Sequence, residues 1–287
     1  MLAPAKINLT LEVLARRDDG FHALRSVMVP VALADELHFA PAGAFSFACE
    51  PSSLAPDNLV VRAFERLGMA NAAVAVSLVK AIPAGAGLGG GSSDAAAVLR
   101  AAMNGSFGPP GSRDWVADAR ALGSDVPFFL ADAPAIVEGT GERVTALGAP
   151  PPWWVVLVVP TVHVATADAY GLLASARATA PPESRPRNTS VTLRCGEALQ
   201  RGEFDTVTAT MTNDFEEVIA DAYPAVRAAL DSLRVAGAAR PMLSGSGGAC
   251  FALAPDEAAA RALGKRLCAP DGARVEIVPF DRGGTWR

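Results

Sequence analysis

The chain carries a run of glycines followed by two serines and an alanine-rich segment. Five glycines occur within residues 85–91, and glycine lets a ligand approach the backbone closely. Ser92 and Ser93 are good helix N-caps, and residues 95–103 are helix formers throughout. The free N–H groups of a helix that starts here would face the loop and favour an anion. The pattern therefore predicts a phosphate-binding site.

Two common nucleotide-binding loops fit this run poorly. Gly85, Gly87 and Gly90 satisfy G-x-G-x-x-G, but a dinucleotide-binding unit needs an acidic residue about 20 positions further on. Residues 105–111 form a loop pattern there instead. A Walker A loop ends in Gly-Lys-Ser/Thr, and no lysine follows these glycines. A plain strand-to-helix turn needs fewer glycines, so we interpret the run as a phosphate loop of a third kind.

Two further segments place charged side chains where they could act on a bound phosphate. Lys6 and Asn8 lie two residues apart on a predicted strand and share one face. Such polar faces commonly meet water, so Lys6 alone is interpreted as solvated. Asp125 lies between Gly123, which ends a predicted helix, and Pro127 in the next, and its plain interpretation is a helix cap. A catalytic role for Asp125 needs a nearby cation, which Lys6 could supply.

Two other segments have the composition of ligand-binding loops. Residues 18–22 have the chemistry of a tight turn, in which Phe21 beside His22 could clamp a planar ring. An ordinary hairpin fits these residues as well. Residues 243–249 contain more small residues than a turn requires, which indicates backbone that approaches a ligand or another loop.

Composition restricts the class of protein. A chain of 287 residues with 51% apolar residues is long enough for one large or two medium globular domains. The net charge of −5 argues against binding of nucleic acid or a membrane surface through a basic patch. No signal-peptide pattern or apolar run of transmembrane length occurs, so we expect a cytoplasmic protein. The scattered cysteines are expected to be reduced core residues: Cys49, Cys195, Cys250 and Cys268.

Three prolines at residues 150–152 predict a boundary that divides the chain into two domains. The first domain would comprise residues 1–151 and the second residues 152–287. Before it, the patterns predict strands at 7–14, 25–33, 36–39 and 74–79, and helices at 58–67 and 114–122. After it, they predict strands at 153–159, 249–254 and 274–279, helices at 167–175, 190–200, 204–211, 224–235 and 256–267, and a surface loop at 179–188. This order indicates an α+β fold with mixed sheets.

Three ordered blocks, at residues 4–9, 83–93 and 243–249, resemble the three motifs of the GHMP small-molecule kinases. Further markers occur in order at residues 16–22, 57–59, 123–127 and 213–214, so the resemblance covers nearly the whole chain. It is strongest to the branch that phosphorylates a cytidine diphosphate derivative of methylerythritol, in the non-mevalonate pathway of isoprenoid biosynthesis. The resemblance implies a two-domain fold, with an ATP-binding domain like ribosomal protein S5 domain 2 followed by a ferredoxin-like domain.

The resemblance also implies roles for individual residues. Lys6 and Asp125 match the catalytic pair, which would transfer a phosphoryl group from ATP, with Mg, to the 2-hydroxyl of the substrate. Asn58 matches a position near the adenine. The ATP-phosphate loop matches Pro83, Ala84, Gly85, Ala86, Gly87, Leu88, Gly89, Gly90, Gly91, Ser92 and Ser93. The residues that hold the cytidine-bearing substrate match Asn8, Phe21, His22 and Tyr170.

Two positions depart from the family pattern. Phe21 replaces the more usual tyrosine, which keeps the ring and loses a hydroxyl group. Asp94 stands where asparagine is common, and its extra negative charge either helps to hold magnesium or only caps the helix. No residue is assigned as a magnesium ligand, and no oligomeric state is assigned.

Three alternative functions remain to be weighed. A kinase of another small alcohol, such as homoserine or mevalonate, would not need the Phe-His pair, which suits a pyrimidine. An oxidoreductase would need the acidic ribose partner that is missing after the glycine run. A non-catalytic nucleotide sensor would not need both Lys6 and Asp125.

Overall fold

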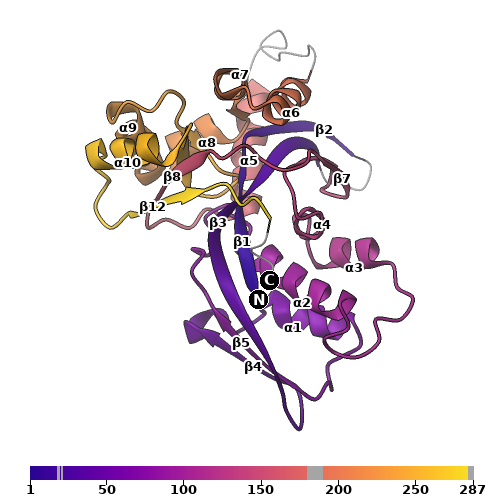
Figure 1. The fold of residues 1–287 in the computed structure, drawn as a ribbon. Helices are drawn as coiled ribbons and strands as arrows, with labels where there is room; N and C mark the ends of the chain where they lie inside the picture. The colour runs from indigo at the N-terminus through magenta and orange to yellow at the C-terminus, as the bar shows by residue number, and fades with distance from the viewer. Residues whose placement is uncertain (18–19, 21, 180–189, 284–287) are drawn as a thin grey trace.

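The structure, a computed structural model, describes residues 1–17, 20, 22–179 and 190–283. Phe21 and all but the first residue of the predicted loop at 179–188 lie outside the described residues. The described residues form two β-sheets covered by helices, which confirms the α+β fold class. The first sheet is mixed, as predicted, whereas the second is antiparallel. Figure 1 shows the first sheet with α1 (Leu59–Arg66) and α2 (Gly90–Met103) on one side.

The first sheet is organised around one long strand, β3 (His22–Pro41), which pairs antiparallel with four others. Those strands are β1 (Leu2–Asn8), β2 (Thr10–Arg16), β5 (Val74–Val79) and β6 (Ala135–Gly139). The sheet is completed by β4 (Ser46–Glu50), parallel to β5, by β7 (Arg143–Ala146), antiparallel to β6, and by β9 (Thr212–Asn213), parallel to β2.

The second sheet is antiparallel and lies in the later half of the chain. Its strand order is β10 (Met242–Leu243), β11 (Cys250–Ala254), β8 (Trp154–Val159) and β12 (Arg274–Pro279). Helices α8 (Glu216–Ala222), α9 (Pro224–Val235) and α10 (Glu257–Arg266) accompany this sheet in Figure 1. The remaining helices are α3 (Trp115–Leu122), α4 (Val126–Leu130), α5 (Thr166–Thr179), α6 (Val191–Arg201) and α7 (Phe204–Thr210).

The two halves of the chain interlock. Strand β9 comes from the second half but extends the first sheet, where Thr212 pairs with Thr10 and Asn213 with Leu11. Helix α6 packs on β2, β3 and β6. The chain after β12 returns to the first sheet, where Asp281 N–H donates to the Pro30 carbonyl. The division at residues 151/152 stays a prediction.

Three predicted elements differ from the structure. The strand predicted at 7–14 is interrupted at Leu9, because Val27 N–H donates to the hydroxyl of Thr10 instead of to a backbone carbonyl. The strands predicted at 25–33 and 36–39 are one continuous strand. Asp35 looks like a turn residue, but it is fully buried in mid-strand and bound to Lys80. Strands β4, β6, β7, β9 and β10 and helix α8 were not predicted.

The other predicted helices and strands agree with the structure to within a few residues. The predicted helix at 224–235 and strand at 274–279 have these bounds in the structure. All four cysteines are free, and three are buried as expected, whereas Cys268 is exposed.

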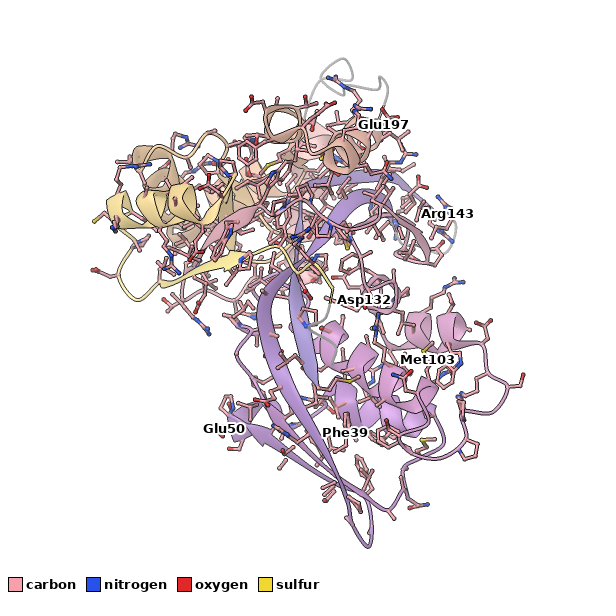
Figure 2. The ribbon with its side chains drawn as sticks, viewed as in Figure 1. Phe39, Glu50, Met103, Asp132, Arg143 and Glu197 are labelled. Atoms are coloured by element: carbon pink, nitrogen blue, oxygen red, sulfur yellow. The ribbon has the colours of Figure 1, made fainter. Side chains whose placement is uncertain are left out.

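Aromatic rings fill the space between the first sheet and its helices. Phe64 of α1 is fully buried and contacts the rings of Phe45 and Phe107 at centroid distances of 4.8 and 5.1 Å. Phe39 of β3, labelled in Figure 2, packs edge-on against Phe107 at 5.2 Å. This core holds α1, and Phe107 just after the end of α2, against the sheet.

We expect Phe64→Ala to lower the free energy of unfolding by about 3–5 kcal/mol, because it leaves a cavity in a closed aromatic cluster. Chemical denaturation of the purified chain measures this loss. Val235→Ala removes a side chain that is 86% exposed and is the matched control; its change should stay within about 0.5 kcal/mol. Equal effects of the two substitutions would contradict this account of the core.

Candidate active site

The glycine run is the connection between β5 and α2. Helix α2 begins at Gly90, and its N-cap is Gly89, whose φ of +73° favours glycine. The prediction that Ser92 and Ser93 cap the helix is therefore wrong: both lie in its first turn. The glycines themselves end the loop, and the unpaired N–H groups of the first turn of α2 follow directly.

A second small-residue loop, at residues 243–249, packs directly on the glycine run. A Cβ atom on Gly87 would lie 2.1 Å from the Ser244 carbonyl oxygen, and one on Gly247 would lie 2.2 Å from the Gly87 nitrogen. Ala249 N–H donates to the Ala86 carbonyl at 2.9 Å. Sequence analysis allowed either a ligand or another loop as the neighbour of residues 243–249. The structure shows another loop, the glycine run.

Two side chains near β9 hold the second loop in place. The Asn213 amide nitrogen donates to the carbonyls of Leu243 and Gly245 at 2.9 and 2.8 Å. A carboxylate oxygen of Glu216 accepts from Leu243 N–H at 2.9 Å. Sequence analysis singled out Asn213 only as a family marker and did not find Glu216, because no local pattern shows which loop a side chain will reach.

Lys6 lies at the point where these loops meet. Its backbone N–H donates to the Leu88 carbonyl at 2.9 Å. Its Nζ atom donates to Asn8 Oδ1 at 2.7 Å and lies 3.4 Å from Asp125 Oδ2. A Cβ on Gly245 would lie 3.2 Å from Nζ. The interpretation of Lys6 as a solvated residue is wrong: the residue is 3% exposed, because the two loops and Asp125 cover this face of β1.

Asn8 continues the polar chain that begins at Lys6. Its amide nitrogen donates to the hydroxyl of Ser26 at 2.8 Å, and that hydroxyl donates to the Thr10 carbonyl at 2.5 Å. The side chain of Asn8 is thereby held with its oxygen toward Lys6. This places Lys6 and Asn8 on one face, as their spacing predicted.

Asp125 occupies the N-cap position of α4, but its side chain makes no capping hydrogen bond. The plain interpretation as a helix cap is therefore wrong. The Asp125 side chain is 29% exposed, whereas that of Lys6 is 4% exposed. The pair thus consists of a buried cation and a carboxylate that a ligand can reach.

The glycine run, Lys6 and Asp125 border one cavity of about 470 Å³. The predicted site residues that line it are Lys6, Asn58, Pro83, Ala84, Gly85, Ala86, Gly87, Leu88, Gly89, Gly90, Gly91, Ser92 and Asp125. Ser93 is fully buried beneath them. The Asn58 side chain caps α1 by accepting from Val60 N–H at 2.9 Å, and it donates to the Leu54 carbonyl.

Two aromatic rings from different halves of the chain meet outside the lining of this cavity. The rings of His22 and Tyr170 are stacked, with centroids 5.5 Å apart and planes 21° from parallel. Tyr170 also packs edge-on against Phe215 at 4.9 Å. Burial raises the pKa of Tyr170, and the negative charge of Asp125 raises it further. Tyr170 therefore lies within the electrostatic reach of the Lys6–Asp125 pair.

Asp94 lies in the first turn of α2, where its carboxylate binds Lys80 Nζ at 2.6 Å. Lys80 also binds Asp35, which lies on β3. Both Lys80 and Asp94 line the cavity. Sequence analysis did not find Lys80 or Asp35. Of the two roles left open for Asp94, capping of the helix is wrong, since α2 has no side-chain cap. A role in holding magnesium stays a prediction.

Comparison with known proteins identifies the family. Residues 58–137 match the model of the GHMP kinases N terminal domain, and residues 197–271 match that of the GHMP kinases C terminal. The 4-diphosphocytidyl-2-C-methyl-D-erythritol kinase of Pelotomaculum thermopropionicum is 40% identical over 275 residues, covering 92% of both chains. The chain belongs to this family of GHMP kinases.

Other members of the family also match over nearly the full length. The 4-diphosphocytidyl-2-C-methyl-D-erythritol kinase of Salinibacter ruber is 38% identical, covering 96% of this chain and 97% of the relative. A crystal structure of a 4-(cytidine 5'-diphospho)-2C-methyl-D-erythritol kinase matches 99% of both chains, with a TM-score of 0.76 and 35% identity. The resemblance found in the sequence is thus confirmed. In the described part of the chain, no helix has the length and apolar character needed to cross a membrane.

We expect Gly247→Ala to weaken nucleotide binding by about tenfold or more, because a methyl group there overlaps the backbone of the glycine run and must displace it. Calorimetric titration with Mg·ATP measures the dissociation constant. Gly43→Ala is the matched control, since a Cβ at Gly43 meets no atom within 4 Å. Unchanged affinity in a folded Gly247→Ala variant would show that the contact between the loops does not shape the cavity.

Proposed function

We propose that this chain transfers the γ-phosphoryl group of ATP to the 2-hydroxyl of 4-diphosphocytidyl-2-C-methyl-D-erythritol. The observation that carries the proposal is the Lys6–Asp125 pair, which borders the same cavity as the glycine run and the N-terminus of α2. The names of the full-length relatives support the substrate. We further propose that the reaction takes place in the cytoplasm.

Phosphoryl transfer depends mainly on positioning and on stabilisation of the charge of the transferred group. In this proposal the N–H groups of the glycine run and of the first turn of α2 hold the ATP phosphates. Asp125 accepts the proton of the attacking hydroxyl late in the transfer. Lys6, held by Asn8 at 2.7 Å, stabilises negative charge on the attacking oxygen or on the phosphoryl group. The loop at 243–249 closes the cavity on the side of Lys6.

The residues present fit a magnesium ion that arrives with the nucleotide. Mg²⁺ prefers oxygen donors and binds proteins through one or two carboxylates together with substrate phosphates. Among the described residues, no group of three or more His, Cys, Asp and Glu side chains forms a metal site. Asp125, a partly exposed carboxylate on the cavity, would hold the ion beside the phosphates. When bound, Mg²⁺ neutralises part of the phosphate charge.

We assign the cytosine of the substrate to the pair of stacked rings. His22 and Tyr170 face one another from β3 and α5, and a planar base can stack on either ring. Asn8 and Phe21 stay predicted substrate residues: the Asn8 side chain is buried against Lys6 and Ser26, and Phe21 lies outside the described residues. Asn58 remains the proposed neighbour of the adenine, with its side chain holding the start of α1.

The first test is release of ADP from Mg·ATP with 4-diphosphocytidyl-2-C-methyl-D-erythritol, homoserine, mevalonate or galactose as acceptor. We expect turnover with the cytidine compound alone. Turnover with another alcohol instead would retain the kinase and reject the substrate. Binding of ATP with no turnover of any acceptor would favour a nucleotide sensor.

We expect Lys6→Met to lower kcat by about three orders of magnitude, with little change in ATP affinity, because the charge is lost where it acts on the transition state. The same ADP-release assay measures kcat, and titration with Mg·ATP measures affinity. Lys265→Met, which removes an exposed lysine at the end of α10, should leave both unchanged. Turnover close to wild type in Lys6→Met would remove Lys6 from the mechanism.

We expect Tyr170→Ala to raise KM for the cytidine substrate by about 10- to 100-fold, the usual effect of losing one base–aromatic stack. KM for ATP should not change, because Tyr170 does not line the cavity that the glycine run borders. Tyr170→Phe keeps the ring and should behave like the wild type. A parallel rise of both KM values in Tyr170→Ala would point to a general loss of structure.

A further inference from the structure

Behind the glycine run lies a buried cluster of three charged side chains, Asp35, Lys80 and Asp94. Asp35 is 0% and Asp94 1% exposed, and the Lys80 side chain is 7% exposed. Lys80 Nζ donates to both carboxylates, at 2.6 Å to Asp94 Oδ2. Two carboxylates share one ammonium group, so the cluster carries one negative charge in excess when all three groups are ionised.

The cluster holds both ends of the glycine run. The second oxygen of Asp35 accepts from the N–H groups of Ala81 and Ile82, at 2.6 and 2.7 Å, just before the run begins. Asp94 lies just after the run, in the first turn of α2. Lys80 connects the two carboxylates. The position of the loop is therefore tied to the charge state of this cluster.

The excess negative charge is concentrated on Asp94. Asp35 uses both oxygens, whereas Asp94 Oδ1 is buried and has no hydrogen-bond partner among the described residues. Burial raises the pKa of Asp94, Lys80 lowers it and Asp35 raises it, and together they leave the pKa raised to about 7. Burial would lower the pKa of Lys80, but its two carboxylates outweigh burial and raise it.

The other charged side chains on the elements around α2 either pair with groups outside this cluster or are exposed. The charges that act on Asp94 are those of Lys80 and Asp35. Cys49 of β4 faces the same cluster, and burial raises the pKa of its thiol. Lys6 of β1 pairs with Asp125, and Arg66 of α1 pairs with Asp118 of α3. On α1, Arg62 and Glu65 are exposed, and α4 contains no charged residue.

We propose that Asp94 is a positioning residue that takes up one proton from solvent when nucleotide phosphates enter the cavity. An ionised Asp94 would repel those phosphates, and protonation removes the repulsion. It also supplies an O–H donor and brings the cluster to neutrality, because Lys80 stays paired with Asp35. The inference rests on the proposed function, because it requires a nucleotide at the glycine run.

The sign of the pH effect follows from the raised pKa. At pH 6 the free protein already holds the proton, so binding takes up little. At pH 8 the free protein has lost it, so binding must recover it. Nucleotide affinity therefore falls as the pH rises above about 7, by up to about tenfold per pH unit.

The experiment is calorimetric titration of the whole chain with Mg·ATP, without the alcohol substrate, in buffers of different ionisation enthalpy. At pH 8 we expect uptake of more than about half a proton per nucleotide, and little at pH 6. Asp94→Asn, which keeps the shape and loses the charge, should abolish the uptake and make affinity independent of pH. This readout does not depend on turnover.

Asp118→Asn is the matched control, because Asp118 is another buried aspartate, paired with Arg66 and Arg113 and outside the cavity; its uptake should equal that of the wild type. Binding without proton uptake in the wild type, or uptake that persists in Asp94→Asn, would overturn the inference. If Asp94→Asn does not fold, a wild-type series at pH 6–8 without proton uptake still overturns the inference. Failure to bind Mg·ATP at all would instead contradict the proposed function.

Discussion

Backbone packing between two glycine-containing loops is the constraint on which the candidate site depends. Gly87 and Gly247 approach so closely that neither position has room for a methyl group. The first loop follows β5 in the first sheet, and the second joins β10 to β11 in the second sheet. Their contact joins the two halves of the chain and covers Lys6. Without it, Lys6 would face water and its partnership with Asp125 would be screened.

Two buried lysines border the cavity, and their carboxylate partners differ in exposure. Lys6 pairs with Asp125, which is partly exposed and can reach a ligand. Lys80 pairs with Asp35 and Asp94, which are both buried. The first pair suits chemistry on a substrate, whereas the second cluster anchors the loop. Because carboxylates largely balance both lysines, the helix N-terminus is the remaining source of positive potential at the cavity.

Local patterns predicted most of the helices and both sides of the glycine run. The helix at 224–235 and the strand at 274–279 follow directly from hydrophobic periodicity and from Pro224. The elements that local patterns failed to predict share one cause: their conformation depends on partners far away in the sequence. Asp35 resembles a turn residue, yet β3 continues through it because Lys80 and two backbone N–H groups satisfy its carboxylate. Strand β9 has two residues, too few to form a pattern, and exists only through its pairing with β2.

The sequence by itself determined the chemical types at the site: the glycine run, the Lys6 and Asn8 face, Asp125 and the small-residue loop at 243–249. It also placed the chain in its family, because these blocks occur in a fixed order. Only the tertiary structure decided that Lys6 is buried, that Asp125 is not a cap, and that Lys80 stands between two carboxylates. Burial and partnership arise from contacts between residues far apart in the sequence, such as Lys6 and Gly245, and no local pattern encodes which distant group will arrive.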